Sequence, residues 1–224
     1  MTKPESIPDI MFNLVTPVSF SILTVPLFLI VLYYCIHPYL DINRIVRYKN
    51  RKQLFSKLLF SLLITTILFV IFYIVIGFLY GWLVTKSLSN PYNTMNGVPY
   101  ILYGDEIDLD WFNTPYMIFR ILSIEISAFL VIGILCTIFF ILIKNFVFAF
   151  FIVESLLLID LSLASLNINS FFTKYAVISI SNWGGFNQLF GILLYFSGVS
   201  IILLIILYIT ITKIDFLPDI RESR

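Results

Sequence analysis

The sequence predicts an all-α, polytopic membrane helix bundle with about five transmembrane helices and a short re-entrant or interfacial helical pair before the last of them. Of the 224 residues, 60% are hydrophobic and only 12% are charged, about half the charged fraction of a soluble domain. The apolar residues form runs long enough to cross a bilayer, which needs about 20 residues of helix. We therefore expect one transmembrane domain, residues 1–224, in the cell membrane.

The apolar runs are separated by polar stretches of very different length. Residues 1–13 include Pro4 and Pro8, and we expect no helix there. Pro17 and Pro26 predict bends in the first span, because proline removes a backbone hydrogen bond. The third and fourth spans are joined by almost no chain, which predicts a tight antiparallel hairpin. The five expected spans are 14–36, 58–84, 116–143, 146–166 and 188–210.

Two loops give the bundle its predicted orientation. The stretch 43–57, within the loop 37–57, carries six Lys/Arg and no acid, and such short basic loops stay in the cytoplasm. The loop 85–115 carries four acids instead and is expected outside the cell. Ten of the 14 Lys/Arg fall on the side assigned to the cytoplasm. The N-terminus is therefore expected outside and the C-terminus inside, with a short surface helix over 43–52.

The segment 167–187 is too interrupted by Asn, Lys and Gly to span the bilayer. We expect a pair of short helices that dip into the outer leaflet, where non-helical backbone must be covered by protein or line a wet cavity. Glycines within the spans are expected at helix contacts. These are Gly77, Gly81, Gly133, Gly191 and Gly198.

Four ionisable residues fall within the third and fourth spans. A charge at the bilayer centre costs about 2.5–3.5 kcal/mol on insertion scales, so each should have a partner. Counted from the outer ends of the two spans, Arg120 and Asp160 lie at matching heights, which predicts an ion pair that clamps the two helices. The other interpretation gives function to Glu125 and Glu154, which would line a polar path or titrate.

The two charged loops also allow two interpretations each. The basic stretch either anchors topology and touches anionic lipid head groups, or docks into a cleft on a cytoplasmic protein. Apolar residues such as Ile45, Tyr48 and Phe55 interleave with its cations, which favours docking. The acidic loop is either simply solvated or captures a cation or cationic peptide.

Several kinds of site are not expected. Cys35 and Cys136 lie in apolar runs, and His37 has no neighbouring Cys or acid, whereas a zinc site needs three or four converging ligands. The sequence has no GxSxG, no HExxH and no glycine-rich phosphate loop. We therefore expect no enzyme, no metal, no cofactor and no nucleic-acid partner. Any ATP hydrolysis would belong to a partner chain.

The order of elements resembles an ABC-2 type permease subunit that lacks its usual first helix. RIVRYKNRKQLFSK (44–57) stands where that family has a cytoplasmic coupling helix, and NSFFTKYAVISISNW (169–183) stands where it has extracellular re-entrant helices. The arginine-rich RYKNRKQ (47–53) at the start of a long span, and Asn182-Trp183 before the last span, are similar to small Gram-positive membrane proteins encoded beside ABC transporters for bacteriocins and other antimicrobial peptides. Five spans in place of six is a departure from the family.

The resemblance implies the permease subunit of an ABC exporter for an amphipathic peptide or lipid-like substrate, in antimicrobial-peptide export or self-immunity. Its partners would be a cytoplasmic ATP-binding subunit, a second permease copy or paralogue, and the bilayer. Asn182 and Trp183 would belong to the outer re-entrant site. The alternative is a non-transporting immunity or scaffold protein that binds a toxin or partner. The ATPase-coupling candidates are Arg44, Arg47, Tyr48, Arg51 and Lys52.

Overall fold

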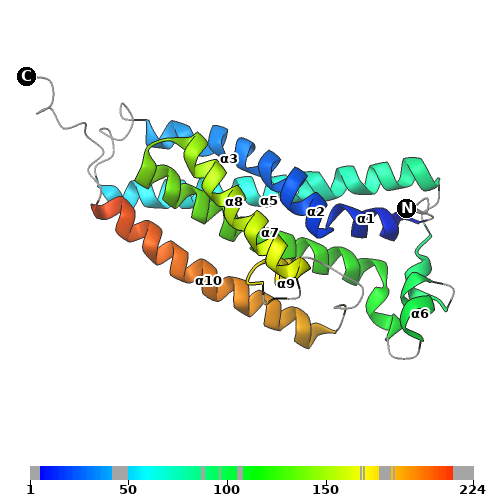
Figure 1. The fold of residues 1–224 in the computed structure, drawn as a ribbon. Helices are drawn as coiled ribbons and strands as arrows, with labels where there is room; N and C mark the ends of the chain where they lie inside the picture. Colours follow the sequence, from blue (N-terminus) through cyan, green and yellow to red (C-terminus); the bar gives the residue numbers. More distant parts are fainter. Residues whose placement is uncertain are drawn as a thin grey trace, which may run out of the picture.

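The described chain is mostly helical, without strands, and five of its helices are long and apolar enough to cross a membrane, which confirms the predicted fold class. The structure is a computed structural model that describes residues 6–41, 50–86, 89–95, 97–104, 108–166, 168, 170–176, 183 and 185–213. Figure 1 shows the long helices running side by side. They are the composite segment Pro17–Leu40, α5 (Arg51–Thr85), α7 (Thr114–Ile143), α8 (Phe146–Ser165) and α10 (Phe186–Lys213).

The first spanning segment is built from three pieces. It consists of α2 (Pro17–Ser19), the π-helical turn η1 (Phe20–Thr24) and α3 (Val25–Leu40). Pro17 begins the segment at a helix N-terminus, where its missing N–H is tolerated. Pro26 has no N–H, so it cannot make the usual helical bond to the carbonyl oxygen four residues before it. Immediately before Pro26, the Val25 N–H bonds to the Phe20 carbonyl oxygen, five residues back, which is the spacing of a π-helix. Pro17 therefore marks a helix start, and Pro26 follows a widened, π-helical turn.

The expectation that residues 1–13 form no helix is wrong. Helix α1 (Ile7–Leu14) precedes the first span and is separated from it by a turn at Val15 and Thr16. Ser6 and Asp9 form a capping box, in which the Asp9 carboxylate accepts from the Ser6 N–H at 2.9 Å. Pro8 lies in the first turn of α1, where it is compatible with a helix.

Helix α1 packs against α5 at two glycines one helical turn apart. A Cβ on Gly77 would overlap Leu14 and lie 3.3 Å from the Met11 sulfur, and one on Gly81 would touch Ile7. Gly133 likewise faces α3. The expectation of helix contacts fails at Gly191 and Gly198, where added Cβ atoms would meet nothing within 4 Å.

Gly77→Leu is expected to lower the free energy of unfolding by about 1–3 kcal/mol, because a larger side chain there pushes α1 off α5. Gly191→Leu is the matched control: it makes the same change in a spanning helix but faces open space. Thermal unfolding in detergent measures both. Equal melting temperatures for the two variants would contradict the α1–α5 contact.

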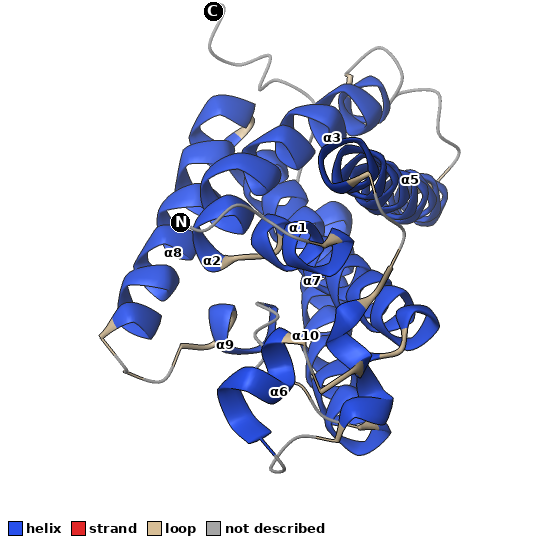
Figure 2. Cartoon of the chain, turned by 90° about the vertical axis from the view of Figure 1, so that its right-hand side faces the viewer, coloured by secondary structure: helices blue, strands red, loops and turns tan. Residues whose placement is uncertain are grey.

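Helix α7 is the central helix of the bundle. It contacts α3, α5, α8 and α10, and Figure 2, which looks along the bundle, shows it in the middle. Most of its apolar side chains are buried, whereas α8 and α10 expose wide apolar faces. Such faces suit contact with lipid or another membrane protein.

The two ends of the bundle differ in charge, and we call them the basic end and the acidic end. At the basic end α3 and α10 finish, α5 begins and α7 turns into α8. Parts of the expected loop 37–57 are helical, since α3 runs to Leu40 and α5 starts at Arg51; the surface helix expected over 43–52 lies mostly outside the described residues. The acidic end carries α1 and the short elements between α5 and α7. These are η2 (Pro91–Asn93), α6 (Val98–Tyr103) and η4 (Leu109–Phe112).

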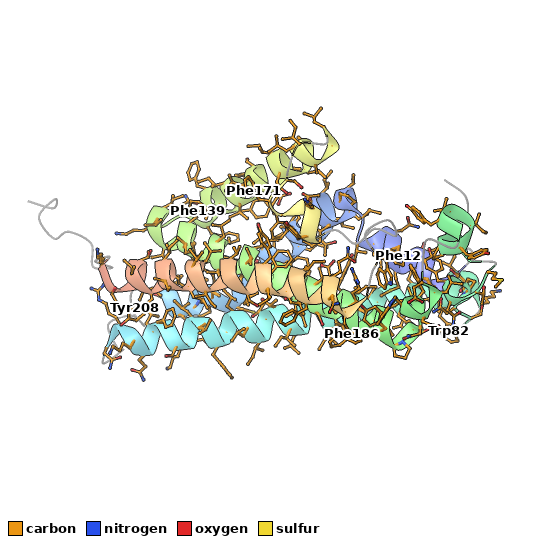
Figure 3. All side chains as sticks on the ribbon, turned by 90° about the horizontal axis from the view of Figure 1, so that it is seen from below. Phe12, Trp82, Phe139, Phe171, Phe186 and Tyr208 are labelled. Carbon is orange, nitrogen blue, oxygen red and sulfur yellow. The ribbon has the colours of Figure 1, made fainter. Side chains whose placement is uncertain are left out.

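Helix α8 is ten residues shorter than α7, although the two share the hairpin at the basic end. At a rise of 1.5 Å per residue, α8 therefore stops about 15 Å short of the start of α7. The segment after α8, with α9 (Thr173–Ala176), lies within the length of the bundle. Figure 3 shows Phe171 of this segment between Tyr208 and Trp82 along the bundle. The second helix of the expected pair falls largely on residues outside the described ones.

Candidate functional site

The basic end holds the described part of the predicted coupling segment. Asn50 caps α5 by accepting from the Gln53 N–H at 2.9 Å, and Arg51 and Lys52 form the first turn. The Arg51 guanidinium donates to the Ile211 carbonyl oxygen near the end of α10 at 3.0 Å. A cation is favourable at a helix C-terminus, so this contact ties the start of α5 to the end of α10. Arg44, Arg47 and Tyr48 lie outside the described residues.

A hollow of about 680 Å³ opens at the same end, between α3 and the α7–α8 hairpin. Its wall combines aromatic rings with polar side chains. The Tyr33 and Phe146 rings lie 4.3 Å apart, and His37, Asp41 and Lys144 also line the space. The hollow can therefore hold a molecule that has both apolar and charged parts.

The predicted ion pair between Arg120 and Asp160 is not formed. Counted from the shared hairpin, Arg120 lies 23 residues along α7 and Asp160 only 14 along α8, a difference in height of about 13 Å. The expectation counted down from the outer ends and so assumed that both helices stop at one level.

Asp160 instead binds the backbone of the segment that follows α8. Its carboxylate accepts from the N–H groups of Phe171 at 2.7 Å, Phe172 at 3.2 Å and Thr173 at 2.6 Å. The Tyr195 hydroxyl adds a bond to the Phe171 carbonyl oxygen at 2.7 Å. Backbone within an apolar bundle must have its polar groups satisfied internally, and Asp160 meets that need for three consecutive amides.

Arg120 connects α7 to α10 and to Trp183. The side chain is only 2% exposed and donates to the Tyr116 hydroxyl and to the Gln188 side-chain oxygen, both at 3.3 Å. Its guanidinium carbon lies 4.7 Å from the centre of the Trp183 ring, a cation–π distance. The structure thus brings two predicted site residues together, while Asn182 lies outside the described residues.

Glu125 is fully buried in α7, and neither carboxylate oxygen has a hydrogen-bond partner among the described residues. It interacts electrostatically with Tyr73 of α5. The Tyr73 hydroxyl donates to the Leu14 carbonyl oxygen of α1 at 2.7 Å, and the Thr24 hydroxyl of the first span lies 3.5 Å from it. Thr24 is the last residue of the π-helical turn, and such turns are frequent at functional sites.

Glu154 is half-buried in α8, and one of its oxygens has no partner among the described residues. Glu154 is ten residues closer to the hairpin than Glu125, which is about 15 Å along the bundle axis. The two acids therefore sit at separate levels, and the structure does not bring them together as a pair.

Sequence reasoning missed a polar and aromatic cluster at the acidic end. The Tyr92 hydroxyl donates to the Asp9 carboxylate at 2.6 Å, and Phe12 packs on the rings of Tyr92 and Trp183. Burial, together with the bond to Asp9, raises the pKa of Tyr92 above its ordinary value, so the phenol stays a donor at neutral pH. The Trp183 indole donates to the Trp111 carbonyl oxygen at 2.7 Å. The S-x-x-D capping box at Ser6–Asp9 was the one feature of the sequence that could have indicated a helix here and so part of this cluster.

The geometry defines a class of protein: a polytopic α-helical membrane protein with polar groups buried along its central helix. No group of three or more His, Cys, Asp or Glu that could hold a metal is found within the described part of the chain. Comparison with known proteins finds no matching family model, curated protein or solved structure.

Proposed function

We propose that the chain is the permease subunit of an ABC exporter, coupled at its basic end to a separate cytoplasmic ATPase. The observation that supports this most is the form of α5. It runs unbroken for 35 residues, begins at Arg51 and Lys52, and contacts α1, α3, α7 and α10. A force applied to its first turn is transmitted along one rigid element to the acidic end.

The charges of the basic end suit an acidic cleft on such a partner. Arg51, Lys52 and Lys57 lie on α5, and Lys144 and Lys213 are at the ends of α7 and α10. Clustered Lys and Arg mark the cytoplasmic side, which is where an ATPase is found. The Arg51 bond to Ile211 makes α10 move with α5.

The substrate in this proposal is an amphipathic peptide or a lipid-like molecule. The hollow beside the α7–α8 hairpin combines aromatic walls with His37, Asp41 and Lys144, so it suits a molecule with both apolar and charged parts. The exposed apolar faces of α8 and α10 would meet a second permease copy, a paralogue or lipid. Antimicrobial-peptide export or self-immunity is the proposed role.

Co-purification from the native host tests the coupling. The full chain, extracted in mild detergent, should retain an ATP-binding subunit, and Lys52→Glu should remove most of it by reversing an exposed charge at the docking surface. Lys174→Glu is the control, since it makes the same change at an exposed residue of α9, away from the basic end. Lys52→Glu is preferred to a change at Arg51, whose bond to Ile211 gives it a structural role.

Equal recovery of the ATPase with Lys52→Glu and Lys174→Glu would contradict docking at the basic end. A complex that contains a toxin or another membrane protein but no ATPase would instead support the non-transporting immunity or scaffold protein.

A further inference from the structure

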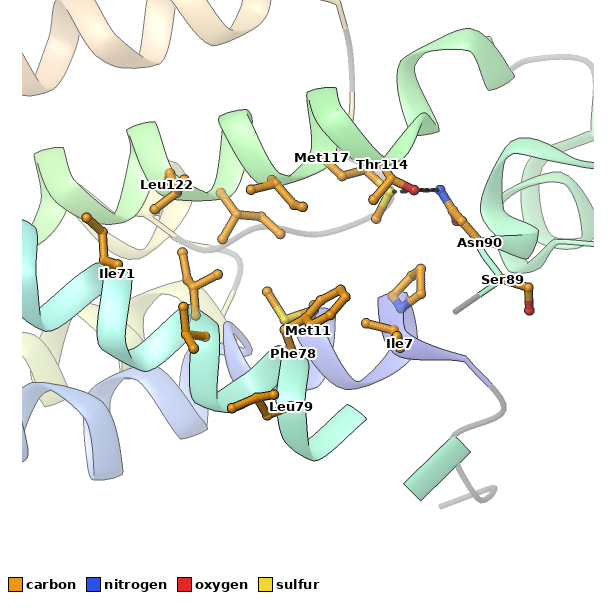
Figure 4. A pocket seen from close by; sticks show the side chains of 15 residues that line it. Ile7, Met11, Ile71, Phe78, Leu79, Ser89, Asn90, Thr114, Met117 and Leu122 are labelled. Carbon is orange, nitrogen blue, oxygen red and sulfur yellow. Dashed lines mark hydrogen bonds between the residues drawn. The ribbon is translucent and has the colours of Figure 1, made fainter. Parts of the chain in front are cut away.

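A groove near the acidic end plays no part in the proposed coupling. It runs between α5 and α7, with α1 as its floor, and encloses about 350 Å³ (Figure 4). Met11 on the α1 floor and Ile121 on the α7 wall are buried, whereas Val75 and Leu79 on the α5 lip are each 48% exposed. The groove is therefore open on the outer, apolar side of the bundle.

The dimensions of the groove select a narrow occupant. It extends from Ile71 to Leu79 on α5 and from Thr114 to Leu122 on α7, which is about 12 Å along each helix. A volume of about 350 Å³ lies at the small end of the range of ligand pockets, which is about 300–1,000 Å³. The groove therefore suits one small molecule or one chain of a larger one.

The lining is apolar along its length and polar at one end. Ser89, Asn90 and Thr114 lie together at the end nearest α6, as Figure 4 shows. The Asn90 amide donates to the Phe112 carbonyl oxygen at 2.8 Å and to the Thr114 hydroxyl at 3.0 Å. The Thr114 hydroxyl keeps its own hydrogen for a further acceptor. A molecule that fits has an apolar chain and an acceptor at its outer end.

We propose that this groove holds one acyl chain of a membrane glycerolipid, with the ester group beside Thr114 and the chain running down toward Ile71. The α5 face around it exposes apolar side chains from Phe60 to Val84, so the groove lies in the band that contacts lipid. Lipid tails are as apolar as the groove, so the chain stays bound through van der Waals packing. Occupancy is therefore sensitive to anything that fills the space.

Photo-crosslinking in a defined bilayer tests this site. The full chain is placed in nanodiscs of phosphatidylethanolamine and phosphatidylglycerol that contain phosphatidylglycerol with a diazirine in mid-chain, and the labelled residues are mapped by mass spectrometry. Labelling should concentrate on Ile71, Ile121 and Leu122. Val75→Trp fills the groove and should reduce that labelling by about tenfold.

Ile76→Trp is the matched control, because Ile76 adjoins Val75 on α5, is also 48% exposed and does not line the groove. It should leave the labelling unchanged. If Val75→Trp does not fold, Leu79→Trp makes the same test, with Leu83→Trp as its control. The site is overturned if both members of a pair label alike, or if labels spread evenly over exposed residues such as Phe72, as annular lipid would give. Absence of lipid label in the groove, as a protein occupant would cause, also overturns it.

Discussion

Replacing Asp160 with alanine is expected to lower the free energy of unfolding by about 3–5 kcal/mol. Three consecutive amides, those of Phe171, Phe172 and Thr173, bond to this one carboxylate. A buried amide that loses its acceptor costs about 1–3 kcal/mol, and no water replaces the carboxylate within an apolar bundle. The segment after α8 should detach first, because the Phe171–Tyr195 bond is the described hydrogen bond that ties its backbone to α10.

Hydrogen exchange and thermal unfolding in detergent measure this effect. The amides of residues 171–173 should lose protection by about two to three powers of ten, the factor that matches 3–4 kcal/mol. Asp160→Asn keeps one acceptor oxygen and should fall between the wild type and alanine.

Ser162→Ala on the same helix is the control for Asp160. The Ser162 hydroxyl bonds only within α8, to the Leu158 carbonyl oxygen, so its loss should change stability by less than about 0.5 kcal/mol. Asp160→Ala with wild-type protection at residues 171–173 would show that the carboxylate does not hold the segment.

The heights of the polar residues show what could be predicted from the sequence. Long apolar runs predicted all five spanning helices, because crossing a bilayer requires many consecutive apolar residues. The same runs also showed that the fourth span is shorter than the third. Counting from their shared hairpin, and not from the outer ends, would have separated Arg120 from Asp160. The ion pair was predicted wrongly because the heights were counted from the wrong ends of the helices, although the sequence contained the information needed.

Other contacts could not be predicted from the sequence. Tyr92 and Asp9 are 83 positions apart, and Arg120 and Gln188 are 68 apart. Nothing local in the sequence pairs such residues, because their meeting depends on how α1, α7 and α10 pack. The bonds from the amides of residues 171–173 to Asp160 could not be predicted either. Every residue except proline has a backbone N–H, so the residue types do not show which N–H groups bond to a side chain.

Glu125→Leu is expected to make the protein more stable, by about 2–3 kcal/mol. Removing an acid from an apolar helix recovers most of its insertion cost, and leucine has a similar size. Thr137→Val on the same helix is the control. Thr137 is equally buried, but its hydroxyl is satisfied by the Gly133 carbonyl oxygen at 2.7 Å, so its loss should bring no such gain.

A carboxyl group that lowers stability is retained where function needs it. In the proposed complex, Glu125→Leu should therefore reduce ATP turnover at least about tenfold while the ATPase still co-purifies, and Glu125→Gln should keep the assembly with intermediate turnover. The electrostatic interaction of Glu125 with Tyr73 supplies the reason, because the Tyr73 hydroxyl also lies 3.5 Å from that of Thr24, the last residue of the π-helical turn. A leucine variant that is less stable than wild type would mean that the carboxyl has a stabilising partner. A leucine variant that is more stable and fully active would show that Glu125 has no part in coupling.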